Sequence, residues 1–90
     1  MTTRVVYKYG PFSLSVHGRP VQYWGTPVMV DLQDGQVYMW CLLENVIAHR
    51  LGVMPCRYAR IAATGEEFEG TYFGSVATPE GFVWHVVEAA

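Results

Sequence analysis

The stretch at residues 27–43 constrains this chain most, because it has the pattern of a β-hairpin. On its first arm Val28, Val30 and Leu32 occupy every second position, which is the period of a strand with one buried face. Asp34-Gly35 separates the two arms. This dipeptide favours a type I′ turn, in which both central residues have positive φ. The sequence therefore predicts a tight hairpin on which a sheet is built.

The second arm of the hairpin, residues 36–43, is apolar on both faces of the predicted strand. One face carries Val37, Met39, Cys41 and Leu43, and the other carries Tyr38, Trp40 and Leu42. A strand that is apolar on both sides is either central in a layered fold or exposed at an oligomer or ligand surface. We expect Tyr38, Trp40 and Leu42 to form an interface.

Further strands are predicted on both sides of the hairpin, because short alternating runs are separated by turns rich in Gly and Pro. They cover residues 4–9, which Gly10-Pro11 ends, and residues 12–17, 57–63, 71–77 and 82–88. A shorter run at residues 21–24 is broken by Gly25-Thr26-Pro27. Between the hairpin and residue 57, Asn45 and Gly52 are suited to begin and end one or two helical turns. We expect this segment to lie on the sheet through Val46, Ile47 and Leu51.

The fold class that follows is all-β: a single domain over residues 1–90, with six to seven mostly antiparallel strands and a short helical crossover near residues 45–52. The sequence does not choose between a small sandwich and a barrel.

Composition sets limits on the partners of this domain. The chain is 51% hydrophobic and only 16% charged, so part of the apolar surface is expected at an interface, most simply in a homodimer. A net charge of −2 without a basic run argues against binding duplex nucleic acid. No apolar run is long enough for a membrane span and no signal peptide is recognisable, so we expect a cytoplasmic protein with Cys41 and Cys56 as free thiols.

The best-represented chemistry is that of ligand binding. Arg57 and Arg60 precede the turn at Thr64-Gly65, and guanidinium groups with turn amides and a hydroxyl suit a phosphate or carboxylate. Aromatic rings on the following strands can stack a base. The predicted site for a small anionic ligand such as a nucleotide consists of Arg57, Arg60, Thr64, Gly65, Tyr72 and Trp84. The alternative is a set of strand arginines that flank an aromatic core.

Catalytic and metal chemistry is poorly represented. His17, His49 and His85 do not have the spacing of metal ligands, and the two cysteines form no zinc motif, so we predict neither a metal site nor a cofactor. His85 lies within an apolar strand and is interpreted as structural. The acidic residues at 66–69 are interpreted as a solvated loop. No nucleophile, base and orienting group can be assembled, and no catalytic residue is predicted.

Several short motifs follow one another along most of the chain. They are Tyr7-Lys8-Tyr9, Gln33-Asp34-Gly35-Gln36 with Trp40, Arg60-Ile61, Thr64-Gly65, Tyr72-x-Gly74 and Val83-Trp84-His85-Val86-x-Glu88. In this respect the chain resembles a domain-of-unknown-function family of short proteins encoded mostly by tailed phages, often those of actinobacteria. It departs from the family in an extended segment at 45–56 and in Glu66-Glu67, where relatives often have His-Pro.

The resemblance implies phage origin and expression in the cytoplasm of an infected bacterium, but no established activity. We therefore expect a non-enzymatic phage accessory protein that binds a host component, either by sequestering a small nucleotide signal or by blocking a host protein, and so counters host defence. A small hydrolase that uses His85 or the 66–69 loop is one alternative. A minor virion or assembly component is the other.

Overall fold

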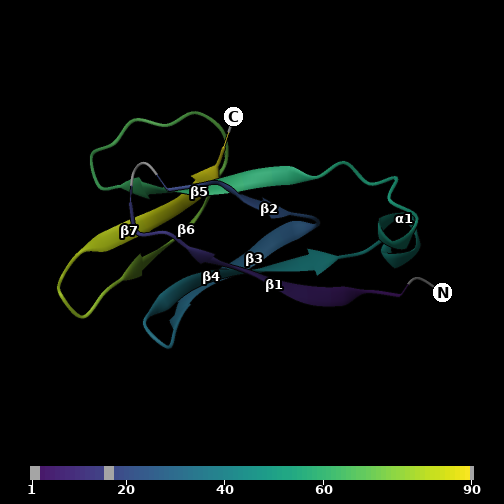
Figure 1. Cartoon of the computed structure of the whole chain (residues 1–90), viewed down its shortest axis with the longest axis horizontal. Coiled ribbons are helices and arrows are strands. Elements are labelled where there is room, and N and C mark those ends of the chain that lie inside the picture. Colours follow the sequence, from purple (N-terminus) through teal and green to yellow (C-terminus); the bar gives the residue numbers. More distant parts are fainter. Residues whose placement is uncertain (1–2, 16–17, 90) are drawn as a thin grey trace.

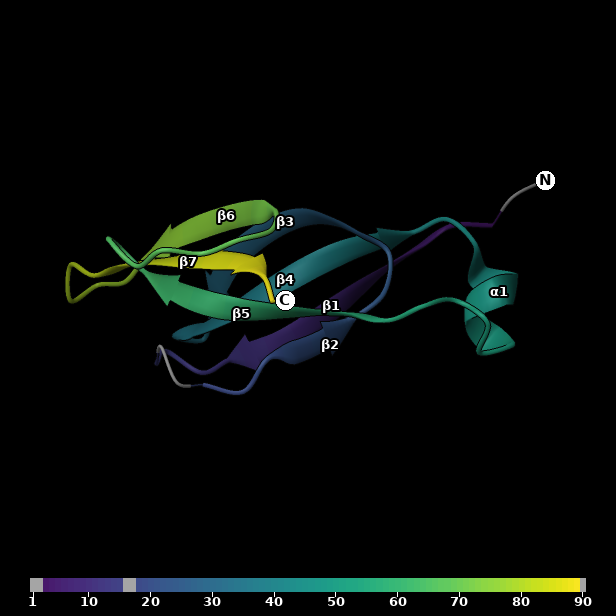
Figure 2. The ribbon, with the colours of Figure 1, turned by 90° about the horizontal axis from the view of Figure 1, so that it is seen from above.

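Two antiparallel sheets and one short helix make up the chain in a computed structural model that describes residues 3–15 and 18–89. The elements are β1 (Val5–Phe12), β2 (Val21–Tyr23), β3 (Thr26–Gln33), β4 (Gln36–Leu43), α1 (Val46–Arg50), β5 (Arg57–Ala63), β6 (Tyr72–Ala77) and β7 (Val83–Glu88). The first sheet has the order β1-β4-β3 and the second β2-β5-β7-β6. The sheets form two layers, with α1 beyond one end of them (Figures 1 and 2). The predicted all-β fold is confirmed.

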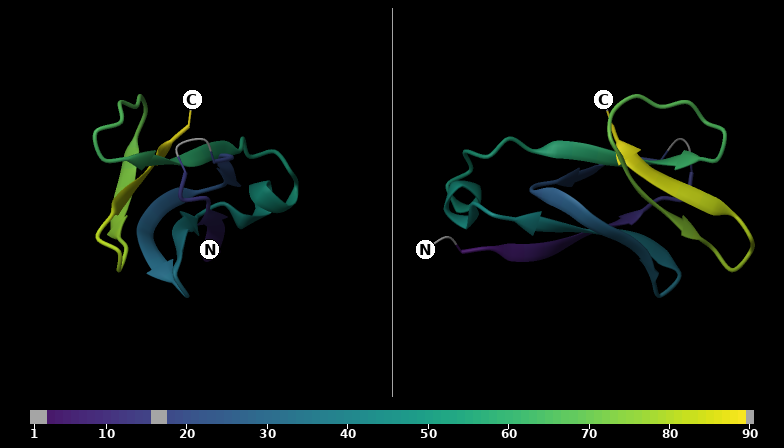
Figure 3. Two further views of the ribbon diagram at one scale, coloured as in Figure 1. Left: turned by 60° about the vertical axis from the view of Figure 1, so that its left-hand side comes forward. Right: turned by 180° about the vertical axis from the view of Figure 1, so that it is seen from behind.

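The central hairpin forms as expected. Asp34 and Gly35 both have positive φ, at 54° and 76°, which is the type I′ geometry. β4 lies between β1 and β3, and its inner-face residues Val37, Met39 and Cys41 are fully buried. They pack against residues of the second sheet, such as Ile61 and Val86, in one hydrophobic core between the two layers (Figure 3). The doubly apolar strand is therefore central in its sheet.

Two edge strands run through prolines that were expected to interrupt them. β1 continues across the cis Gly10–Pro11 bond, and β3 begins before Pro27. Both strands pair with β4 through a shift of register at the proline, where an edge strand can do without one N–H. The shift beside Pro27 also moves Val28 away from the core, and its side chain is 57% exposed.

The strand predicted over residues 12–17 is wrong for residues 13–15. Phe12 ends β1 and is buried in the core, whereas Leu14 is exposed. Ser13 and Ser15 instead make backbone hydrogen bonds typical of a turn, from Ser15 N–H to Ser13 C=O and from Gly18 N–H to Ser15 C=O. Local alternation alone gave the expectation, and no neighbouring strand completes the pairing. Residues 16 and 17 lie outside the described residues.

The helical crossover has the predicted ends. The Asn45 side chain accepts a hydrogen bond from Ala48 N–H, and Gly52 has φ of +70°. Hydrogen bonds from Gly52 N–H to His49 C=O and from Val53 N–H to Ala48 C=O complete a Schellman motif. Within residues 3–15 and 18–89 no helix has the length and apolar character needed to cross a membrane.

The helix does not lie on the sheet as expected. Only Val46 is buried, while Ile47 and Leu51 are about 70% exposed (71% and 70%). The five-residue helix lies beyond the C-terminal end of β4 and beside the start of β1, where His49, not Ile47 or Leu51, packs on Tyr7 (Figure 2). Ile47 and Leu51 therefore add to the exposed apolar surface of the molecule.

Candidate functional site

The outer face of the second sheet is covered by its own loop. Residues 64–71 leave β5, arch over the sheet and return at β6 (Figure 1). Ala62 and Val87 point away from the main core, yet they are 1% and 0% exposed, because this loop lies over them. We call this surface, consisting of the outer side of β5, β7 and β6 with residues 64–71, the loop face.

The loop begins with a β-turn that fixes its direction. Glu66 N–H donates to Ala63 C=O at 3.0 Å, and Gly65 has φ of +90°. Negative φ at Thr64 followed by positive φ at Gly65 gives a type II turn, in which glycine is favoured at the third position. The Thr64-Gly65 turn that the sequence singled out thus brings Glu66 back over β5.

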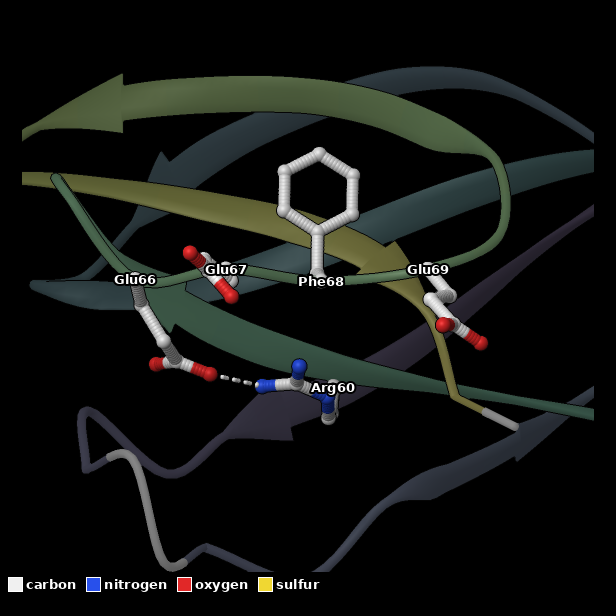
Figure 4. Close-up of a pocket in the computed structure, with 5 residues that line it drawn as sticks. All are labelled: Arg60, Glu66, Glu67, Phe68 and Glu69. Carbon is white, nitrogen blue, oxygen red and sulfur yellow. Dashed lines mark hydrogen bonds and ion pairs between the residues drawn. The ribbon is translucent and has the colours of Figure 1, made fainter.

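The turn returns Glu66 to a place where its carboxylate is held on both oxygens. Oε2 lies 2.5 Å from Arg60 Nη1, and Oε1 accepts a 3.2 Å hydrogen bond from the backbone N–H of Ala63. Arg60 Nη1 also donates to Ile61 C=O at 3.2 Å. Both side chains of the ion pair are only about a quarter exposed (25% and 26%), so solvent screens it less than a surface pair. We call Arg60, Ala63 N–H and the Glu66 carboxylate the clasp. Figure 4 shows its ion pair between Arg60 and Glu66.

His85 ties both ends of the loop to β7. Its Nε2 lies 2.9 Å from the Thr64 hydroxyl, where the loop begins, and its Nδ1 lies 3.0 Å from the Tyr72 hydroxyl, where the loop ends. The Thr64 hydroxyl also donates to Val83 C=O at 3.2 Å. One imidazole therefore contacts both ends of the span that covers Ala62 and Val87.

The direction of these hydrogen bonds bears on catalysis. The Thr64 hydroxyl has one proton to donate. When it donates this proton to Val83 C=O, the contact with His85 requires that Nε2–H donates to Thr64 Oγ1. His85 Nδ1 then accepts from the Tyr72 hydroxyl, so a single neutral tautomer satisfies all three contacts. A general base would have to accept the hydroxyl proton instead. The arrangement thus suits a latch rather than an activated threonine.

Exposed aromatic rings lie beside the clasp. Phe68 and Tyr72 are 39% and 49% exposed, with ring centroids 6.1 Å apart and planes inclined by 33°. An open pocket of about 760 Å³ is lined by Arg60 and by residues 66–69 of the loop. In Figure 4 the Phe68 ring stands between Glu67 and Glu69 and points away from the clasp. The residues described contain no ion pair of Glu67 or Glu69, and no cluster of metal-ligating side chains.

The six residues predicted to bind a ligand do not form one group. Arg60, Thr64, Gly65 and Tyr72 lie together on the loop face. Arg57 belongs to the opposite side of β5, because it is an odd number of residues from Arg60, and it pairs with Glu88 at 3.5 Å. Trp84 lies across from Ala63 and Val76 on the core side and packs near Phe82. Sequence alone missed Glu66 and His85 as the partners that organise this group.

The three residues predicted to form an interface lie together on the outer face of the first sheet. Tyr38, Trp40 and Leu42 are half-buried and point away from the core. Val6 and Met29, their cross-strand neighbours on β1 and β3, are 52% and 46% exposed. Lys8 crosses this face, with Nζ 4.6 Å from the Tyr38 ring centre and 2.7 Å from Gln33 Oε1. We call this surface the open face.

The structure thus defines a small two-sheet β domain with a loop-covered polar site on one outer face and an uncovered apolar sheet on the other. The chain belongs to the family described as domain of unknown function DUF7352, whose model matches residues 3–90. No curated protein and no solved structure matches it. The expectation of a family of unknown function is confirmed, while the phage origin stays a prediction.

Proposed function

We propose that this protein is a non-enzymatic binding protein and that its loop face holds a small anionic ligand, such as a nucleotide. One observation supports this most directly: Arg60 and the Ala63 amide already bind an anion, namely the carboxylate of Glu66. A guanidinium and a backbone N–H that converge on two oxygens are the groups that bind phosphate or carboxylate in proteins.

The rest of the ligand has a place beside the clasp. Phe68 and Tyr72 present exposed rings on the same face, and an aromatic ring can stack any nucleobase. The pocket of about 760 Å³ is lined by both Arg60 and Phe68, so a ligand with its phosphate at Arg60 and its base against Phe68 would lie within it. A mononucleotide is within the size range that such pockets accommodate.

The charge of the pocket limits the ligand further. Its lining has one arginine and three glutamates, a formal charge of −2 (+1 − 3). Glu67 and Glu69 would repel the successive charges of a polyphosphate. A nucleotide with a single phosphate suits the site better than a nucleoside triphosphate.

In biological terms, we propose a phage accessory protein that acts in the cytoplasm of the infected bacterium and withdraws a small nucleotide signal from host defence. The support for this context is the resemblance to phage-encoded proteins together with the small binding domain. Fold alone does not determine function, and the proposal therefore depends on the loop face.

A host protein is the second candidate partner, and the open face favours it. Tyr38, Trp40 and Leu42 with exposed Val6 and Met29 form an apolar sheet surface of the kind that another protein covers. The same surface would serve in the expected homodimer. A hydrolase has less support, because in the tautomer that satisfies the Thr64, Val83 and Tyr72 contacts His85 donates to the Thr64 hydroxyl instead of accepting its proton. A virion role would use the same open face as a host partner.

Native mass spectrometry tests the proposal. The protein is incubated with small-molecule extract from defence-activated bacteria, and we expect a retained mass of nucleotide size. Arg60→Ala should abolish it, whereas Arg50→Ala, which removes the same charge from the exposed end of α1, should not. Retention that survives Arg60→Ala would place any ligand elsewhere. A native mass without any retained ligand would direct the search to protein partners of the open face.

A further inference from the structure

Glu66 occupies the position that the proposed ligand needs. Its two carboxylate oxygens use the two donors of the clasp, one from Arg60 and one from the Ala63 amide. An incoming phosphate cannot use these donors while the carboxylate remains there. The type II turn at Thr64-Gly65 holds Glu66 close, so the clasp closes without any large movement of the sheet.

We infer that Glu66 is a built-in competitor: the clasp is an anion site that the chain keeps closed with its own carboxylate, and a phosphate ester binds by displacing it. This inference rests on the proposed function, because it concerns regulation of the same site. The occupied clasp shows which chemistry fits, namely an anion that presents two oxygens on one atom, as carboxylates and phosphates do.

The competition has a predictable size. An intramolecular carboxylate acts at a high effective concentration, in the millimolar range for short flexible links and higher when the link is held in shape. The apparent affinity for an external anion is reduced by the fraction of molecules in which the clasp is open. If the clasp is open about one tenth of the time, removing the competitor tightens binding about tenfold.

The carboxylate also gives the site selectivity. A ligand with only a weak anionic group does not displace Glu66, whereas one that combines a phosphate with a stacked ring gains from Phe68 and Tyr72 as well. The site should therefore discriminate strongly between a nucleotide and free inorganic phosphate, because both must displace the same carboxylate but only the nucleotide has the second contact.

The test is a titration of the full chain with adenosine 5′-monophosphate, followed by ¹⁵N NMR at the amides of Ala63 and Gly65. Glu66→Gln keeps the side-chain shape but removes the charge that Arg60 binds. Glu67→Gln is the matched control, because it removes an identical charge one residue away from the clasp. We expect Glu66→Gln to tighten binding about tenfold and Glu67→Gln about twofold or less, since only the first opens the clasp.

Further probes make the outcomes distinct. Arg60→Ala should remove the response in every background, and adenosine, which lacks the phosphate, should bind without shifting the Ala63 amide. Binding to the native chain that Glu66→Gln tightens no more than Glu67→Gln would overturn the inference but leave the proposed function standing. Absence of binding in both the native chain and Glu66→Gln would overturn both. If the Glu66→Gln variant binds adenosine 5′-monophosphate and the native chain does not, the inference is supported, and this nucleotide is not the ligand of the native chain.

Glu66→Asp is a second variant, which controls for the possibility that Glu66→Gln changes binding only by loosening the loop. It retains the charge on a side chain one methylene shorter, which cannot reach Arg60 and the Ala63 amide together as Glu66 does. Tightening of AMP binding by Glu66→Asp, between the native chain and Glu66→Gln, would support displacement. If Glu66→Asp binds no more tightly than the native chain while Glu66→Gln does, simple charge removal rather than competition is at work and the inference is wrong.

Discussion

The two outer faces of this two-sheet domain differ in how far they are covered. On the loop face, residues 64–71 bury Ala62 and Val87 and are held by His85 and the clasp. On the open face no described loop or helix covers the strands, and Val6 and Met29 are about half exposed (52% and 46%). Both faces belong to sheets that share one core. They differ in what covers the side opposite the core.

The difference fits the separate roles proposed for the two faces. A face that is closed by directed hydrogen bonds has fixed polar geometry, which is what a small ligand requires. A face with apolar side chains and few fixed polar contacts suits a broad partner surface, where burial rather than geometry supplies most of the binding free energy. The loop face is thus the proposed ligand site, and the open face the proposed protein interface.

The largest expected effect tests whether the loop face is a second buried layer. Val87→Asp places an unpaired carboxylate under the loop, and we expect a loss of about 3 kcal/mol or more in the free energy of unfolding. Val6→Asp makes the same change on the open face, and at a concentration low enough to dissociate the expected dimer, so that water reaches the side chain, it should cost about 1 kcal/mol or less. Urea denaturation measures both. A cost at Val6 equal to that at Val87 would mean that the open face is covered in solution.

The next prediction concerns what covers the open face. We expect the native chain to sediment as a dimer at micromolar concentration, and Met29→Glu to raise the dissociation constant about 100-fold, roughly 2.7 kcal/mol, because a charge would be buried between the subunits. Ile47→Glu makes the same change on α1, away from this face, and should leave the dimer intact. A monomeric native chain at this concentration would refute the homodimer.

The latch predicts a smaller effect that is confined to the loop face. His85→Ala removes both hydrogen bonds to the loop ends, and we expect a loss of about 2 kcal/mol in unfolding free energy, with faster amide exchange in residues 64–71. Thr64→Val and Tyr72→Phe each remove one of these bonds and should cost about 1 kcal/mol.

The matched control for the latch is His49→Ala. Its ring packs against Tyr7 and Trp24 at the other end of the molecule, with centroid distances of 5.7 Å and 5.2 Å. Exchange in the loop should not change in this variant. Equal protection of residues 64–71 in the native chain and in His85→Ala would show that the clasp alone holds the loop.

Sequence reasoning recovered the features that depend on local chemistry. The Asp34-Gly35 turn and the caps of α1 at Asn45 and Gly52 are fixed by residues within a few positions of one another. It failed at residues 13–15, where alternation existed but no partner strand did, and at Ile47 and Leu51, whose apolar character said nothing about the helix lying beyond the sheet.

The candidate site was recovered in part for the same reason. Arg60 and Thr64-Gly65 are close in sequence to the turn that organises them. The approach of His85 from β7 depends on the register of β5 with β7, where Ala62 lies opposite His85. The placement of Arg57 on the other side of β5 follows from alternation along a strand and could have been predicted, since residues 57 and 60 differ by an odd number.

The inner face of the first sheet can be compared with both outer faces through the titration of one buried thiol. Cys41 is fully buried beside the half-buried Trp40 and Leu42 on β4, and burial raises the pKa of its thiol from 9.0 to about 12. Because the folded-state pKa lies above the unfolded value, this contribution to stability is complete below pH 9 and is lost as pH rises from 9 towards 12. At pH 10 the loss should be about 1 kcal/mol relative to pH 8. Chemical denaturation at pH 8, 9 and 10 measures this loss of unfolding free energy. We expect Cys41→Ala to flatten the decline with pH. Cys56→Ala is the control, because Cys56 is partly exposed, and it should show the same decline as the native chain. An unchanged slope in Cys41→Ala would mean that alkaline destabilisation arises from other groups, and Tyr9 and Tyr23, whose pKa values burial also raises, would be tested next.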